Sequence, residues 1–324
     1  MTRSRKISYL LFGVMIAAVI ALGAGPMLLA GLFSYMILDV VNRNLAQKTK
    51  KFYARWLSFL VFSVTVFLVS HMFISFVQRS LVTLPKIVVS VVPRAVELAG
   101  QYGFALPFED AEELRKVFIA TIQENVRAIT KMSGLMSKRF FYIIVGMVIA
   151  ALCFFGESNG SYRDNLFDAI RKELSLRIGK FMEGFEKVVG AQLIISGINT
   201  ILTAIFLIIT DLPYLTFLIP ATFIVGILPI LGNVISNTFI VGTALVVSPK
   251  LAVFALGFLI VIHKMEYFLN SKIVGSNLNA PMWQTLIGIL VGEMVMGIPG
   301  IILAPALLYY IREEMTAIPC ADNK

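Results

Sequence analysis

Charge, histidine and cysteine are scarce in this sequence. Only 15% of its 324 residues are charged, and it holds two histidines and two cysteines. Soluble domains carry about 25% charged residues. Cys153 lies in an apolar run and Cys320 in the C-terminal tail, which is neither a disulfide framework nor the spacing of a zinc site. We therefore expect no resident metal and no cofactor.

Nucleotide and metalloprotease motifs are also missing. The sequence has no GxxxxGK[ST], no GxGxxG and no HExxH. Their absence argues against an ATP-driven pump and against a nucleotide-dependent enzyme. Two histidines on distant segments also offer little to an intramembrane enzyme. We predict that the protein is not an enzyme.

Apolar residues are what the chain has in excess. They make up 58% of it, and the mean hydropathy is +0.86. Several apolar runs exceed the roughly 18 residues that indicate a membrane span. This predicts an all-α polytopic membrane protein, with an unusually apolar soluble helical domain as the alternative. The net charge of +9 is explained by loops that orient the chain in the membrane, so we expect lipids and no nucleic acid as partners.

Residues 1–78 predict three transmembrane helices, over Ile7–Leu22, Met27–Val41 and Trp56–Val77. Basic residues gather at the N-terminus and again over 43–55, and such residues favour the cytoplasmic side. The N-terminus imitates a signal peptide, but a second apolar run follows at once. We expect an uncleaved first helix with its N-terminus in the cytoplasm.

Two polar segments interrupt the membrane helices. Residues 79–138 are predicted to be an extracytoplasmic, amphipathic helical segment. Residues 139–187 are predicted to hold a fourth membrane helix, Phe140–Phe155, followed by a cytoplasmic amphipathic helix. Each amphipathic helix either packs on its own protein and on lipid headgroups or binds a partner.

The C-terminal half repeats one pattern. A plain helix leads through a polar turn into an apolar run that glycine and proline break at its centre. Residues 188–247 hold the helix Val188–Thr210 and the broken run Tyr214–Val247; residues 248–324 hold the helix Leu251–Phe268, the broken run Met282–Ile311 and a cytoplasmic tail. The breaks are "GILPILGN" (226–233) and "GIPG" (297–300).

Each half of a broken run has about 15 residues, fewer than the roughly 20 that a span needs. This favours two re-entrant helical hairpins that form an inverted repeat and build a site where their tips meet, within about eight membrane segments. Two proline-kinked crossings are the alternative. The predicted hairpin tips are Gly226, Pro229 and Gly232 in the first run and Gly297, Pro299 and Gly300 in the second.

Polar residues in apolar segments are the candidate ion-binding or substrate-binding groups, because burying them in a membrane is costly. Glu266 and Asn270 share a helix face with His263, and Glu293 precedes the second break. The further candidates are the amides Gln192, Asn199 and Asn233. Glu266 is expected to carry a proton or to bind Na⁺ transiently. The alternatives are a cluster at a helix end and amides that only join helices.

The segments "GAQLIISGIN" (190–199), "LPILG" (228–232), "EYFLNSKIVG" (266–275) and "GIPGIILAP" (297–305) resemble elements of the AI-2E transporter family, the PerM-like permeases. Ser271 departs from the family's pattern, where a proline is expected. The resemblance implies a homo-oligomeric secondary transporter of the bacterial inner membrane. It also implies either export of a small solute, such as a quorum-sensing signal, or exchange of Na⁺ and protons.

We therefore expect a permease whose site lies at the two broken hairpins. Its partner would be a small solute or a monovalent cation and proton. A non-transporting membrane scaffold or regulatory protein is the alternative, and it would hold its partners with segments 78–138 or 157–187.

Overall fold

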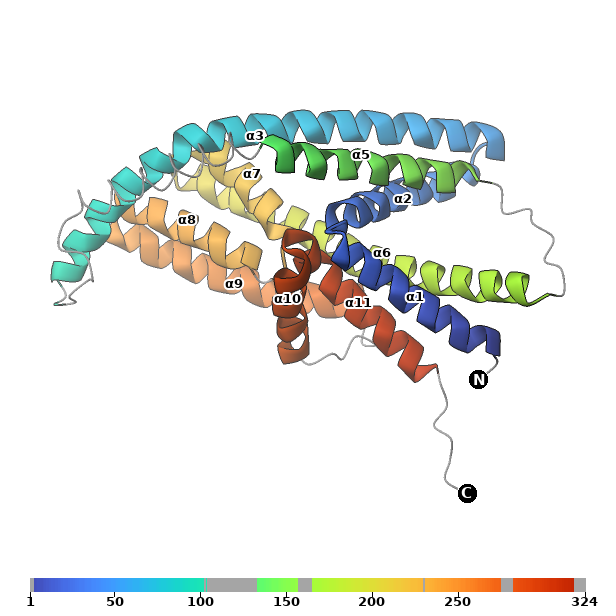
Figure 1. The fold of residues 1–324 in the computed structure, drawn as a ribbon. Helices are drawn as coiled ribbons and strands as arrows, with labels where there is room; N and C mark the ends of the chain where they lie inside the picture. Colours follow the sequence, from blue (N-terminus) through green and yellow to red (C-terminus); the bar gives the residue numbers. More distant parts are fainter. Residues whose placement is uncertain are drawn as a thin grey trace, which may run out of the picture. The chain divides into compact units, whose positions relative to one another are not determined.

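The computed structural model describes residues 3–101, 103, 133–156, 165–229, 231–274 and 282–317. Within these ranges all regular secondary structure is helical (Figure 1). The helices are α1 (Arg3–Ala21), α2 (Gly25–Ala46), α3 (Lys51–Gln101), α5 (Ser133–Phe155), α6 (Leu166–Ile209), α7 (Leu215–Gly226), α8 (Leu231–Val247), α9 (Pro249–Val274), α10 (Met282–Met296) and α11 (Ile298–Thr316). The predicted all-α class is confirmed.

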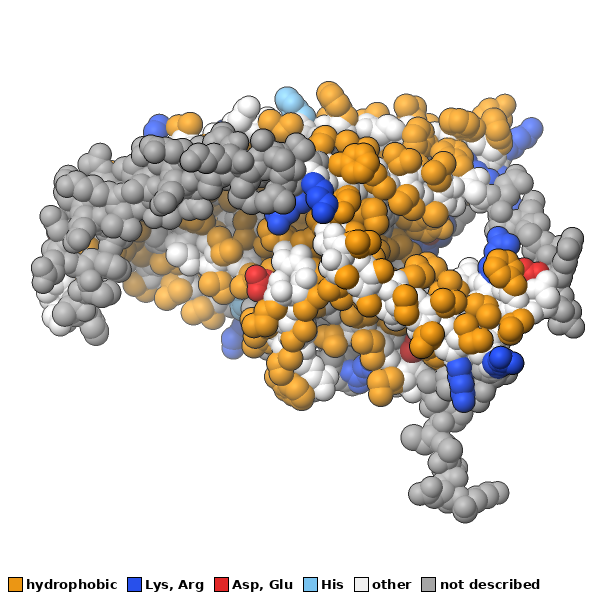
Figure 2. Space-filling view, viewed as in Figure 1, with side chains coloured by type: hydrophobic (Ala, Val, Ile, Leu, Met, Phe, Trp, Pro, Cys, Tyr) orange, Lys and Arg blue, Asp and Glu red, His pale blue; other side chains and the backbone are white. Residues whose placement is uncertain are grey.

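Five helices of the described chain are long and apolar enough to cross a membrane, namely α1, α2, α3, α5 and α6. Large apolar side chains such as Phe67, Met72 and Leu152 are exposed on them. Figure 2 shows apolar side chains over much of the described surface, with few charged ones between them. A surface of this kind is stable in lipid and not in water, so the chain is a multi-pass membrane protein.

The helices form two compact units, which we describe separately. The first unit comprises Met1–Phe67, Ser137–Gly190 and Asn277–Lys324, and it contains α1, α2, α10, α11 and most of α5. The second comprises Leu68–Met136 and Ala191–Ser276, and it contains α7, α8 and α9. Helices α3, α5 and α6 each contribute one part to each unit.

In the first unit, α2, α3 and α5 share an apolar core. Leu38, Phe62 and Phe154 are buried there against one another. Helices α2 and α5 approach so closely that a Cβ on Gly146 would lie 2.2 Å from the carbonyl oxygen of Met27. Only glycine permits this contact between two backbones, so the crossing depends on a small residue, as in other membrane helix pairs.

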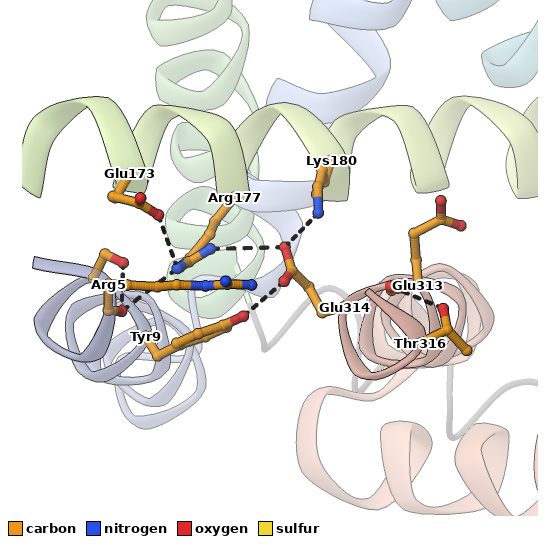
Figure 3. A network of polar contacts seen from close by, with 9 residues as sticks. Arg5, Tyr9, Glu173, Arg177, Lys180, Glu313, Glu314 and Thr316 are labelled. Atoms are coloured by element: carbon orange, nitrogen blue, oxygen red, sulfur yellow. Dashed lines mark hydrogen bonds and ion pairs between the residues drawn. The ribbon is translucent and has the colours of Figure 1, made fainter. Parts of the chain in front are cut away.

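A buried charged network joins α1, α6 and α11 in the same unit (Figure 3). The Arg177 side chain on α6 is 3% exposed and the Glu314 side chain on α11 is 6% exposed, with 3.7 Å between their nearest charged atoms. The Tyr9 hydroxyl donates to Glu314 at 2.7 Å, and Lys180 lies 3.1 Å from that carboxylate. Glu173 lies 3.2 Å from Arg177.

The surroundings of Glu314 keep it ionised. Burial alone would raise the pKa of this carboxyl group, which lies beyond the apolar run that ends at Ile311. The hydrogen bonds from Tyr9 and Lys180, together with the charges of Lys180 and Arg177, outweigh that effect and lower the pKa below its ordinary value. Arg177 therefore faces a charged partner.

Replacing Arg177 by Met is expected to lower the free energy of unfolding by about 3–5 kcal/mol, because it leaves the Glu314 carboxylate buried without its arginine partner. Thermal unfolding in detergent measures the loss. Glu183→Gln is the matched control, since it removes the exposed ion pair with Lys187, and such pairs contribute about 0–1 kcal/mol. Equal melting temperatures for the two variants would contradict this account.

In the second unit, the core lies between α6, α7, α8 and α9. Leu207, Leu218, Ile240 and Ala255 are buried in it, one from each of these helices. Ring pairs add to this packing, with Phe206 stacked on Phe258 of α9 at 4.2 Å between centroids. This core fixes the backbone that carries the polar residues of the unit.

Each broken run forms a helical hairpin, in which two helices pack antiparallel against each other. In the first run, the ring centroids of Phe217 on α7 and Phe239 on α8 lie 5.8 Å apart, while Gly226 and Gly232 meet at the turn. Pro229 lies in the turn itself. In the second run, a Cβ on Gly292 of α10 would lie 2.5 Å from the Gly300 carbonyl oxygen of α11.

The turn of the second hairpin is a single glycine. Gly297 caps α11 with φ 66° and ψ −143°, a conformation that side-chain-bearing residues rarely adopt. Pro299 and Gly300 lie in the first turn of α11, where proline needs no hydrogen-bond partner. The helices therefore break within the predicted segments 226–233 and 297–300, between Gly226 and Leu231 in the first run and at Gly297 in the second.

The predicted end of the third helix, at Val77, is wrong. Helix α3 continues through Pro85 and Pro93 to Gln101. Proline removes a backbone hydrogen bond, but packing compensates for it here: Ile87 is buried in the core of the second unit, and Val91 packs against that core. The amphipathic helix predicted within 79–138 falls mostly on 104–132, outside the described residues.

The predicted boundary between a cytoplasmic amphipathic helix and the helix Val188–Thr210 is also wrong. Helix α6 runs unbroken from Leu166 to Ile209, because no proline interrupts it. The apolar stripe of the predicted amphipathic helix includes Phe167, Phe181 and Phe185, of which Phe181 and Phe185 are buried and Phe167 is exposed. The stripe therefore packs on its own unit at one end only.

Candidate functional site

The candidate site lies in the second unit, on one face of α6. Gln192, Ser196 and Asn199 follow one another there at helical spacing, so their side chains project in one direction. Each of the three donates a hydrogen bond to another element of the unit. This polar face of α6 therefore contacts α7 and α9 and does not face lipid.

Glu266 on α9 is the charged centre of the site. Its Oε2 atom accepts hydrogen bonds from the side-chain amides of Asn199 on α6, at 3.2 Å, and of Asn233 on α8, at 2.8 Å. The Glu266 side chain is 13% exposed. The structure thus brings together three of the predicted site residues from three helices.

His263 lies one turn before Glu266 on the same helix. Its Nδ1 atom is 3.8 Å from Glu266 Oε2, too far for a hydrogen bond, and its side chain is 57% exposed. It contributes an ion pair to the site only when the imidazole is protonated. The side chain of Asn270, also predicted to belong here, lies outside the described residues.

The turn between α7 and α8 leaves backbone carbonyl groups free. The N–H of Ile227 would bond to the Phe223 carbonyl in a continuous helix, but it bonds to Val225 instead. Ser196 Oγ donates to the Phe223 carbonyl at 2.8 Å, and Gln192 Nε2 donates to the Gly226 carbonyl at 2.7 Å. Side chains of α6 therefore replace the donors that the break removes.

Close contacts explain the glycines at this turn. A Cβ on Gly226 would lie 2.6 Å from Ser196 Oγ and would displace that hydroxyl, and a Cβ on Gly232 would lie 2.2 Å from the Val225 carbonyl oxygen. The second contact is with backbone, so it leaves no room for a side chain. The two glycines therefore let α6, α7 and α8 meet at the point from which Asn233 reaches Glu266.

One oxygen of the site has no partner. The Oδ1 atom of Asn199 is buried and accepts no hydrogen bond from any residue that the structure describes, while its Nδ2 atom is used by Glu266. A buried acceptor without a donor is costly, so such an atom points to a ligand. Carboxylate and amide oxygens are what hard cations prefer.

The carboxylate predicted in the second hairpin is exposed, unlike that of Glu266. The Glu293 side chain on α10, in the first unit, is exposed, and it makes no hydrogen bond or ion pair with a described residue. Its backbone carbonyl accepts the N–H of Gly297 at the turn. A role for Glu293 in binding stays a prediction.

The sequence interpretation did not include Ser196 or one short motif. Ser196 lies one turn from Gln192 and from Thr200 on an apolar helix, and this spacing of polar residues could have indicated its role. The motif is "GESNG" (156–160), which fits the G-x-S-x-G pattern of serine hydrolases. That pattern requires a strand before the serine, whereas here α5 precedes it, so the match does not support a hydrolase.

A broken helix whose freed carbonyls face polar side chains, next to a carboxylate among apolar residues, is typical of membrane transporters. A family model described as AI-2E family transporter matches residues 7–319, nearly the whole chain. The chain belongs to this family, which confirms the resemblance seen in its motifs and supports a role as a permease. No curated protein matches the chain.

Proposed function

We propose that this transporter exchanges a monovalent cation, Na⁺ foremost, for protons, and that Glu266 binds both in turn. The observation that carries the proposal is the convergence of two amides, from Asn199 and Asn233, on the Glu266 carboxylate. An ionisable group in such a position is expensive in a membrane protein and is kept for function.

The chemistry of the donor set supports a cation. Glu266 supplies a negative oxygen, and Asn199 Oδ1 supplies a neutral oxygen that is buried and unpartnered. A sodium ion bound by these oxygens excludes a proton from the carboxylate, and a proton on the carboxylate removes the charge that holds the ion. The two ions therefore compete for one site, which is what an exchanger requires.

We also propose that both hairpins are re-entrant and enter from opposite faces of the membrane as an inverted repeat. Helices α7 and α10 have 12 and 15 residues. At about 1.5 Å per residue they are too short to cross a hydrocarbon layer of about 30 Å. The distribution of Lys and Arg supports cytoplasmic termini, and the family resemblance supports a bacterial inner membrane and a homo-oligomer.

If the first hairpin is re-entrant, a cysteine at Leu228 in its turn should react slowly with a membrane-impermeant maleimide applied to either side. A cysteine at Ser248, after α8, serves as the reference for a surface loop. Both are made in a background without Cys153 and Cys320. If Leu228→Cys reacts as fast as Ser248→Cys from the opposite side, α7 and α8 are two full crossings.

Flux in proteoliposomes with an internal pH dye tests the proposed function. An imposed Na⁺ gradient is expected to drive proton movement through the wild-type protein, and a choline gradient of equal size is not. Export of a radiolabelled organic signal without ion-driven proton flux would instead favour the solute exporter. Failure of both, with loss of cellular function on deleting residues 157–164, would favour the non-transporting scaffold.

A further inference from the structure

The two hydrogen bonds from α6 to the end of α7 join the break to the ion site. Gln192 and Ser196 lie on the same face of α6 as Asn199, with about one helical turn between each residue and the next. Asn199 donates to Glu266, whereas Gln192 and Ser196 donate to carbonyls of α7. Helix α6 therefore donates hydrogen bonds both to the Glu266 carboxylate of α9 and to the carbonyls at the end of α7.

The end of α7 in turn fixes the start of α8. Gly232 packs against Val225 and Gly226 so tightly that a Cβ on it would overlap the backbone of both. Asn233 is the next residue, and its amide donates to Glu266 at 2.8 Å. Any shift of the α7 end relative to α6 consequently moves the Asn233 amide relative to the carboxylate.

The bonds to α7 are specific to the break. In a continuous helix the Phe223 carbonyl would accept from the N–H of Ile227, which here bonds to Val225. The Gly226 carbonyl lies at the last residue of α7, where carbonyls lack a partner within the helix, and it accepts from Gln192 Nε2 at 2.7 Å. Ser196 is 2% exposed, so the bond from its hydroxyl to the Phe223 carbonyl is shielded from water in this structure.

We propose that Gln192 and Ser196 are positioning residues, which clamp the freed carbonyls of α7 and thereby hold Asn233 against Glu266. The consequence for ion binding rests on the proposed cation site, but the clamp itself does not. Neither residue needs to touch the ion. Loosening the clamp is expected to weaken ion binding while leaving the titrating carboxylate in place.

Sodium-driven proton flux separates this role from that of Glu266. Gln192→Met keeps the size of the side chain without its donors, and Ser196→Ala removes the hydroxyl. Each is expected to raise the KM for Na⁺ about 3- to 10-fold, the range for one lost hydrogen bond, with the maximal rate within about 2-fold of wild type. Ser196→Thr restores the hydroxyl and is expected to restore the KM.

Thr200→Val is the matched control, because among the described residues the Thr200 hydroxyl bonds only to the carbonyl of Ser196 in its own helix. It is expected to leave the KM unchanged. A lower melting temperature for Gln192→Met and Ser196→Ala, with a KM equal to that of Thr200→Val, would show that the bonds are merely structural and would overturn the proposal.

Alkylation of Leu228→Cys tests the clamp without any assumption about the ion. Adding Gln192→Met or Ser196→Ala to this variant is expected to raise the alkylation rate several-fold, and adding Thr200→Val is not. Faster alkylation in a protein that shows no ion-driven flux would uphold the clamp and refute the proposed function. An unchanged alkylation rate would refute the clamp, whatever the flux.

Discussion

Replacing Glu266 by Gln is expected to reduce Na⁺-driven proton flux about 100-fold or more. Glutamine keeps the size of the side chain and still accepts the amides of Asn199 and Asn233, but it neither titrates nor neutralises a bound cation. Loss of that charge in a partly desolvated site costs roughly 3 kcal/mol, and each 1.4 kcal/mol is about tenfold in an equilibrium constant. Proteoliposomes with an internal pH dye measure the loss.

Two other carboxylates make this test specific. Glu183→Gln alters an exposed ion pair on α6 and is expected to leave the flux unchanged. Glu293→Gln alters the carboxylate that the sequence singled out in the second broken run. If Glu266→Gln keeps the wild-type flux while Glu293→Gln loses it, the site belongs to the second hairpin and the assignment made here is wrong.

Replacing Gly300 by Ala is expected to give the largest loss of stability of any single methyl group added to the described chain. A Cβ at this position would lie 1.8 Å from the carbonyl oxygen of Gly292, well inside any possible contact. Overpacking usually costs about 1–3 kcal/mol, and a clash between two backbones exceeds what side-chain adjustment can relieve. We expect a large fall in the melting temperature in detergent, or no folded protein.

Gly257→Ala on α9 is the matched control, since a Cβ there meets no atom within 4 Å. It is expected to be neutral or stabilising by about 0.5–1 kcal/mol, because alanine favours a helix over glycine. Gly292→Ala should also destabilise the protein, because a Cβ there would lie 2.5 Å from the Gly300 carbonyl oxygen. Melting of Gly300→Ala at the temperature of Gly257→Ala would contradict the hairpin packing described above.

Local chemistry made the breaks predictable from sequence. Pro229 cannot donate a helical hydrogen bond, and Gly297 adopts a backbone conformation that other residues avoid. Such effects act within a few residues, so they are visible in the sequence without knowledge of the fold. Both hairpin turns therefore fall where the glycine and proline pattern put them.

Tertiary packing made the other boundaries unpredictable. Pro85 and Pro93 indicated the end of a helix, but Ile87 packs into the core of the second unit and keeps α3 continuous. The same applies to the site: Asn199, Asn233 and Glu266 were each singled out as costly polar groups, yet nothing in their spacing shows that two amides meet one carboxylate oxygen. That convergence depends on how α6, α8 and α9 pack.

Equilibrium binding of radioactive Na⁺ to the purified protein tests the central claim most directly. The account predicts saturable binding to the wild type that weakens as the pH falls, because protons compete for Glu266. It also predicts that Glu266→Gln loses the binding at every pH, while Glu183→Gln keeps it. Binding to Glu266→Gln with wild-type affinity and unchanged pH dependence would contradict the account.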